Sequence, residues 1–317
     1  MIDRIPSGTR DVLPDEMREV RAITEVLRGV FEAEGYGEVY TPALEYESVL
    51  ARGDMATARP TYRLFDEHGD VLALRSDMTV PIARLVATRY AGAEPPLRFC
   101  YFAHAYRGVR PQRGQPREFL QAGIELVGAP APDGTVEALT VLCRALDAVG
   151  LRDYRVGLGD ASLYPRLLAA HQVAEDVRPR LLDALARRDL AGLEREVATA
   201  GLDEELVSAP QRRGGPEVLD AATGPLDQAL AAMRAVRDRL DAKVAERVIF
   251  DLGLTRELGY YTGAVFEIYD PALGAPIGRG GRYDELLSRF GHPLPAVGFA
   301  LNAERVHIAL TGEERMA

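Results

Sequence analysis

The order of strand-like and helix-like segments along this chain is compatible with few folds. Strand patterns are frequent before about residue 160, almost vanish between 161 and 246, and return from 247 onwards. Ala, Leu, Arg, Asp and Glu dominate the middle stretch, as in RPRLLDALARRDLAGLEREVATA. A strand-rich region that resumes after a helical one indicates a helical insertion within a single core. We therefore expect an α+β fold, with residues 1–160 and 247–317 as the core and 161–246 as a helical insertion subdomain.

Hydrophobic spacing places individual elements within this outline. Apolar residues recur at helical spacing in residues 15–34, 79–90 and 134–149. Residues 63–77 read as a hairpin with His68–Gly69 in the turn, and Pro42 interrupts a strand in VYTPALEY. Further strands are predicted in LRFCYFAHAYRG, EFLQAGIELVG, YRVGLGD, RVIFDLG, YYTGAVFEIYD and PAVGFALN.

Composition excludes several classes of protein. The 317 residues carry a net charge of −10, which argues weakly against general nucleic-acid binding. Lys243, the only lysine, follows no glycine loop, so P-loop chemistry is excluded. The two cysteines and five histidines show no metal-binding spacing, and we expect neither a metal nor a cofactor. No secretory signal or membrane span is visible, so a cytoplasmic protein is expected.

A cluster of arginines joins two of the predicted strands. Its members are Arg107, Arg110, Arg113 and Arg117. Arginine forks suit carboxylate and phosphate oxygens, so the loop reads as an anion clamp. A solvated hairpin tip is an equally good interpretation in a chain so rich in arginine.

The strand after this loop alternates apolar and polar side chains. Leu120, Ala122, Ile124 and Leu126 would point one way, and Gln121, Gly123 and Glu125 the other. The polar side is either the floor of a pocket or the wet face of a half-exposed sheet.

Three other stretches also carry candidate residues. Asp77 or Thr79 in RSDMTVP could simply cap the following helix. Tyr260 and Tyr261 fit strand packing with polar tips. Gly280 and Gly281 predict a turn, or less often an anion nest, before a helix.

Taken together, these segments resemble the catalytic core of histidyl-tRNA synthetase, a class II aminoacyl-tRNA synthetase. YTPALEY is similar to motif 1, the dimer-forming segment. FAHAYRGVRPQRGQPREFLQAGIELVG is similar to motif 2 and its loop, RELGYYTGAVFE to the histidine-specific signature, and GFALNAERV to motif 3. The resemblance covers nearly the whole chain and implies a mostly antiparallel sheet flanked by helices.

The resemblance also implies a set of histidine-binding residues. They are Asp77, Thr79, Arg107, Gln121, Glu125, Arg256, Tyr260 and Tyr261. Carboxylates and a hydroxyl suit the ammonium group, and Arg256 suits the carboxylate. Glu125 and a tyrosine can hold the two ring nitrogens, each of which needs a partner when buried.

Several positions depart from the synthetase pattern. Val109 stands where a glutamate helps to hold ATP, and Asn302 where a glycine packs against adenine. Glu257 and Gly259 replace the Gly and Asp of the histidine signature. The printed sequence ends twelve residues after Arg305, and we expect no C-terminal anticodon-binding domain.

With these departures the chain is most similar to a paralogous family, the regulatory subunits of ATP phosphoribosyltransferase. That resemblance implies a subunit without catalytic residues of its own. Its partners would be a short-form catalytic subunit, a second copy of itself in a dimer, and L-histidine as feedback ligand in the first step of histidine biosynthesis. It implies no tRNA and no membrane partner. The alternatives are a truncated histidyl-tRNA synthetase that still activates histidine with ATP, and a related enzyme that aminoacylates another acceptor.

Overall fold

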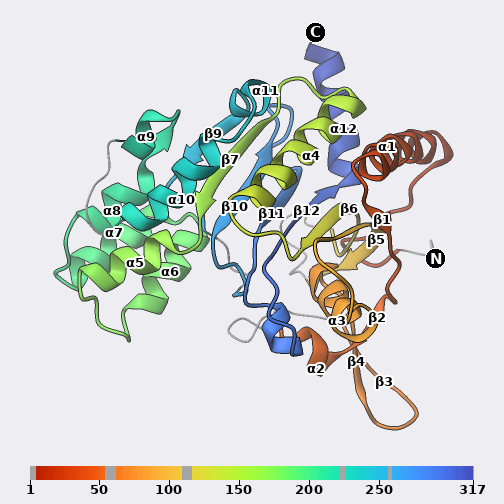
Figure 1. Ribbon diagram of the computed structural model, residues 1–317, viewed down its shortest axis with the longest axis horizontal. Coiled ribbons are helices and arrows are strands. Elements are labelled where there is room, and N and C mark those ends of the chain that lie inside the picture. The colour runs from red at the N-terminus through yellow and green to blue at the C-terminus, as the bar shows by residue number, and fades with distance from the viewer. Residues whose placement is uncertain (1–4, 54–61, 109–115, 221–225, 256–258, 317) are drawn as a thin grey trace.

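A central sheet of nine strands runs through the part of the chain that this computed structural model describes, residues 5–53, 62–108, 116–220, 226–255 and 259–316 (Figure 1). Its spatial order is β1 (Gly37–Glu38), β5 (Leu97–Tyr106), β6 (Glu118–Val127), β12 (Ala296–Asn302), β11 (Gly278–Arg282), β10 (Ala264–Tyr269), β7 (Arg155–Asp160), β9 (Val248–Asp251) and β8 (Arg213–Gly214). Neighbours are antiparallel except β1 with β5 and β7 with β9. The expected α+β fold with a mostly antiparallel sheet is confirmed.

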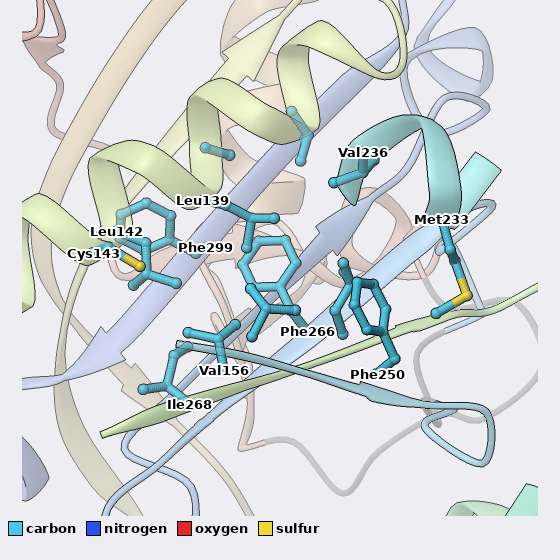
Figure 2. Packing of buried hydrophobic residues seen from close by; sticks show 14 of the residues in the cluster. Leu139, Leu142, Cys143, Val156, Met233, Val236, Phe250, Phe266, Ile268 and Phe299 are labelled. Carbon is cyan, nitrogen blue, oxygen red and sulfur yellow. The ribbon is translucent and has the colours of Figure 1, made fainter. Parts of the chain in front are cut away.

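Three helices cover one face of this sheet: α1 (Pro14–Ala33), α4 (Asp133–Val149) and α12 (Ala303–Met316) (Figure 1). Ile124 on β6 lies opposite Phe299 on β12, and both side chains point toward the helices. The Phe299 ring packs edge-on against Phe31 of α1, with 5.8 Å between ring centroids. Figure 2 shows Leu139, Leu142 and Cys143 of α4 lying over strand residues of the same cluster. Because strand side chains alternate, Glu125 and Gly298 face away from this core.

The helix limits agree closely with the hydrophobic spacing. Pro14 occupies the first turn of α1, where its missing N–H costs nothing. Gly150 ends α4 in the left-handed conformation, with φ of 99°. The segment expected at 79–90 forms α3 (Thr79–Arg89).

A small separate sheet contains the predicted hairpin. Its order is β2 (Leu44–Tyr46), β4 (Val71–Leu74) and β3 (Arg63–Phe65), and the short helix α2 (Glu47–Leu50) follows β2. Gly69 lies in the β3–β4 turn with φ of 87°. Pro42 separates β1 from β2, which belong to different sheets, so the predicted interruption is confirmed.

The helical stretch between β7 and β9 contains most of the remaining helices. They are α5 (Leu163–Ala170), α6 (Arg178–Ala186), α7 (Leu190–Thr199), α8 (Glu205–Ser208), α9 (Glu217–Asp220), α10 (Asp227–Arg237) and α11 (Ala242–Ala245). A 3-10 turn, η2 (Ala209–Gln211), lies in the same stretch, and a second one, η3 (Leu287–Phe290), follows β11. Buried residues of these helices, such as Leu167 and Leu193, belong to the same apolar cluster as the sheet. The division into a core and an insertion subdomain stays a prediction. Within the described ranges, no helix is both long enough and apolar enough to cross a membrane.

The turn predicted at Gly280–Gly281 is wrong, because both glycines lie inside β11. A Cβ on Gly280 would come within 2.4 Å of the Phe266 ring, and one on Gly281 within 2.7 Å of the Tyr261 ring. Glycine is required here by aromatic rings that press against the strand from both faces, which strand patterns alone do not reveal.

Candidate functional site

A cavity of about 180 Å³ opens on the sheet face that points away from α4. Seven of the eight residues predicted to bind histidine line it together: Asp77, Thr79, Arg107, Gln121, Glu125, Tyr260 and Tyr261. The eighth, Arg256, lies outside the described residues, as do Val109 and Glu257. Segments from α3, β5, β6, β11 and β12 thus meet at one place, and we call this space the first cavity.

Glu125 lies almost completely buried in the first cavity, with 1% of its surface exposed. Oε1 accepts a hydrogen bond of 2.7 Å from the Thr79 hydroxyl, and Oε2 accepts one from the Tyr283 hydroxyl. Burial raises the pKa of Glu125 to about 8, although these two hydrogen bonds partly oppose the rise. A carboxyl group that titrates near neutral pH at the bottom of a pocket is typical of a functional site.

Two glycines make room for this arrangement. A Cβ on Gly298 would lie 1.9 Å from Oε2 of Glu125, and a Cβ on Gly123 would lie 2.6 Å from the Tyr101 hydroxyl. Both substitutions would also collide with the backbone, because a Cβ on Gly123 would lie 2.2 Å from the Phe299 carbonyl oxygen and one on Gly298 would lie 2.4 Å from that of Ile124. The glycine between Gln121 and Glu125 therefore leaves room for a tyrosine from the next strand.

Gln121 and Glu125 are not on a wet sheet face, because only 7% and 1% of their surfaces are exposed. Oε1 of Gln121 is buried and has no hydrogen-bond partner among the described residues. A buried acceptor without a partner costs free energy, which a donor on a bound ligand would recover. Gln121 and Glu125 thus lie on the floor of a pocket rather than on a half-exposed sheet face.

The capping interpretation holds for only one of the two candidates at the start of α3. Oδ1 of Asp77 accepts from the backbone N–H of Val80 at 3.2 Å, as a capping carboxylate does. The Thr79 hydroxyl donates instead to Glu125, 46 residues later. Thr79 therefore serves the cavity rather than the helix end.

The opposite end of the first cavity is basic. Arg107, Arg279 and Arg305 line it, and the guanidinium of Arg107 lies 4.6 Å from the centre of the Phe119 ring. Burial lowers the pKa of Arg305, whose Nη1 donates to the Pro276 carbonyl at 2.6 Å. Asn302 also lines this end, and its Oδ1 accepts from the N–H of Arg305 at 2.8 Å. The cavity thus combines a carboxyl end with a guanidinium end.

The arginine loop is only partly described. Arg110 and Arg113 lie outside the described residues. Arg107 lines the first cavity, whereas Arg117 donates its backbone N–H to the Gly8 carbonyl at 2.8 Å and is not among the lining residues. Because Arg107 lines the first cavity, the anion-clamp interpretation is favoured for this residue over the solvated hairpin tip.

Two tyrosines of the site escaped the sequence analysis. Tyr283 follows β11 and reaches Glu125, and its ring packs edge-on against Tyr260 at 5.8 Å. Tyr101 on β5 faces the same cavity across Gly123. Burial raises the pKa of both hydroxyls well above the ordinary value. The sequence signal for Tyr283 is its position directly after the Gly–Gly–Arg stretch, for which the glycines predict a turn.

Comparison with known proteins agrees with this geometry. The family model described as histidyl-tRNA synthetase matches residues 8–306. An ATP phosphoribosyltransferase regulatory subunit from Desulforamulus reducens is 39% identical, over 97% of this chain and 79% of that protein. The chain belongs to the histidyl-tRNA synthetase-like family of ATP phosphoribosyltransferase regulatory subunits. A second regulatory subunit, from Symbiobacterium thermophilum, is 42% identical over 96% of this chain and 79% of its own length.

A solved member of the regulatory-subunit family shares the fold over almost the whole chain. The Bacillus halodurans protein, described as an ATP phosphoribosyltransferase regulatory subunit/histidyl-tRNA synthetase, superimposes with a TM-score of 0.89 at 32% identity. The match covers 98% of this chain and 84% of that one.

Among the residues that the structure describes, no group of three or more His, Cys, Asp or Glu side chains could hold a metal ion.

Proposed function

We propose that this chain is the regulatory subunit of an ATP phosphoribosyltransferase, without catalytic activity of its own, and that the first cavity binds free L-histidine. It would activate a short-form catalytic subunit and bring histidine feedback to the first step of histidine biosynthesis. The observation that supports this most is that seven of the predicted histidine-binding residues line one cavity, in a chain whose relatives are named regulatory subunits.

The two ends of the first cavity suit the two ends of histidine. Glu125 can accept from a ring N–H, and Gln121 offers a second buried acceptor without a partner. Asp77 and Thr79 are assigned to the ammonium group, while Arg107 lies at the basic end, where a carboxylate fits. Arg256 is assigned to the same carboxylate from the sequence resemblance alone, because it lies outside the described residues.

Reconstitution with a short-form catalytic subunit tests both halves of the proposal. The purified chain is mixed with that subunit, complex formation is followed by size exclusion, and transferase activity is measured with and without L-histidine. We expect a complex, activity above that of the catalytic subunit alone, and inhibition by histidine. Absence of a complex would refute the regulatory role.

The Glu125→Gln variant separates the ligand site from the regulatory role. In assays above pH 8, where Glu125 is ionised, we expect the variant to activate the catalytic subunit normally while shifting the histidine inhibition curve about ten- to a hundredfold upward, the effect of losing a charge-assisted hydrogen bond. Glu246→Gln, an equal charge change at an exposed position, is the matched control. Unchanged inhibition in Glu125→Gln would locate the feedback site elsewhere and leave the regulatory role standing.

One observation favours a second candidate, an enzyme that activates histidine with ATP. Arg107, Arg279 and Arg305 form an end of the cavity at which a phosphate could bind. ATP–pyrophosphate exchange in the presence of histidine decides between the two. We expect no exchange above background, and histidine-dependent exchange would favour the enzyme.

A further inference from the structure

A second cavity, of about 340 Å³, lies on the other face of the sheet. It shares no lining residue with the first cavity. Its floor consists of Leu158 and Asp160 on β7, Ala264 on β10 and Arg282 on β11. Ala264 is paired with Asp160, and the N–H of Thr262 donates to the Arg282 carbonyl at 2.9 Å, so these residues lie side by side across the strands. The walls come from the start of α4 and from α10.

Two buried donors of the second cavity have no hydrogen-bond partner among the described residues. They are Nη1 of Arg282 and Oγ1 of Thr135, in side chains that are 3% and 1% exposed. The other nitrogens of Arg282 are engaged: Nε donates to Asp284 at 2.9 Å and Nη2 to the Ala129 carbonyl at 2.8 Å. The guanidinium is therefore held in place while one of its nitrogens, Nη1, lacks an acceptor. A native fold rarely leaves such groups unsatisfied.

The remaining polar groups of the floor are already satisfied. Oδ1 of Asp160 accepts from both the N–H of Ser162, at 2.8 Å, and its hydroxyl, at 2.6 Å. Nε of Arg166 donates to the same hydroxyl at 3.3 Å. What the second cavity lacks is therefore an acceptor beside Arg282 and Thr135, not a donor.

The rest of the lining limits the size and charge of an occupant. Met233 and Val236, both on α10 and labelled in Figure 2, line the cavity with apolar side chains, and Leu158, Ala264 and Pro132 add to them. The titratable groups are two arginines, Arg282 and Arg166, and two acids, Asp160 and Asp284. The acids disfavour a dianion such as phosphate, and the apolar cover disfavours a strongly hydrated ion. A single negative charge on an apolar body fits best.

We propose that the second cavity binds a small monocarboxylate, whose oxygens accept from Arg282 and Thr135 and whose short apolar body packs under α10. A carboxylate supplies two acceptor oxygens to two donors, and a guanidinium–carboxylate contact is among the stronger hydrogen bonds. The volume lies at the lower end of small-molecule pockets. This site is independent of histidine binding in the first cavity.

Calorimetry on the full chain with isovalerate, and with isovaleramide as its neutral counterpart of equal shape, tests the proposal. We expect isovalerate to bind at least about tenfold more tightly than the amide, as the loss of a charge-assisted hydrogen bond implies. No isovalerate binding to the wild type would mean that water alone satisfies the donors and would overturn the proposal. Equal binding of acid and amide would also overturn it.

Two variants locate the binding. Thr135→Val keeps the shape of the side chain and removes the hydroxyl, and we expect it to weaken isovalerate binding roughly fivefold. Ala232 lines the cavity from an exposed position on α10, so Ala232→Phe can fill the cavity without disturbing the core and should abolish binding. Isovalerate binding that neither variant changes would lie elsewhere and would contradict the assignment.

Discussion

The Tyr283 hydroxyl donates a hydrogen bond to Oε2 of Glu125, a residue 158 positions earlier in the chain. The Thr79 hydroxyl donates to the other oxygen of the same carboxyl group. Glu125 is thus held from both sides by side chains of α3 and of the segment after β11. Its orientation in the first cavity is set before any ligand arrives.

Removing the Tyr283 hydroxyl should weaken histidine binding. In Tyr283→Phe one hydrogen bond that lowers the pKa of Glu125 is lost, so the pKa rises further and the carboxylate becomes rarer at neutral pH. We expect histidine affinity, measured by calorimetry at pH 7, to fall roughly fivefold or more. Tyr164→Phe is the matched control, because that buried hydroxyl donates to the Leu206 carbonyl and does not line the cavity. Equal affinities for both variants would contradict this role.

Above pH 8, where Glu125 is ionised, Glu125→Gln should weaken histidine binding by about ten- to a hundredfold, since a charge-assisted hydrogen bond contributes roughly 1.5–3 kcal/mol. The fold should survive, because Glu125 faces away from the core beneath α4. Calorimetry on the isolated chain, with circular dichroism as a check of folding, gives the measurement. A wild type that binds no histidine, either alone or with its partner, would show that the first cavity is not the histidine site.

The raised pKa of Glu125 also predicts how stability depends on pH. The folded state keeps the proton up to about pH 8, whereas the unfolded chain releases it near the ordinary value of 4.5. The unfolded state therefore binds fewer protons in this window, and the free energy of unfolding falls by about 1.4 kcal/mol per pH unit as the pH rises through it. Above the folded-state pKa no further loss is expected.

Glu125→Gln lacks this titration, so its stability relative to wild type should grow from about pH 5 to about pH 8 and then level off. Urea unfolding at several pH values measures the difference, with Glu246→Gln as the control for the change in net charge. Parallel pH profiles for wild type and Glu125→Gln would show that Glu125 is ionised in the folded protein at neutral pH.

The predicted dimer contact is the motif 1 segment around Pro42, which leads into β2 of the small sheet. Register places Leu44, Tyr46 and Leu64 on one face, and each is more than 40% exposed. An apolar face of this kind, directly after Pro42, marks an interaction site. We expect Leu64→Glu to convert a dimer into a monomer in light scattering at micromolar concentration. Ile308→Glu, at a similarly exposed apolar position on α12, should leave the dimer intact. A wild-type monomer would refute the prediction.

Local sequence patterns were sufficient to predict the succession of elements and the side of each strand that faces the core. Periodicity placed α1, α3 and α4 within a residue or two, and alternation assigned Gln121 and Glu125 to the face opposite Ile124. These are local properties, because a helix or strand repeats its own geometry over a few residues. The family motifs further indicated which polar residues to expect together at one site.

Which distant side chains meet depends on how the segments pack in three dimensions. The turn expected at Gly280–Gly281 became a strand because Phe266 and Tyr261 press against it, and Tyr283 was missed because its partner Glu125 lies on a strand far away in the sequence. Likewise, Arg282 and Thr135 carry no sequence pattern, yet they leave two unsatisfied donors in one cavity. Burial, the pKa of a carboxyl group and the partner of a donor all depend on packing between segments, which local periodicity does not encode.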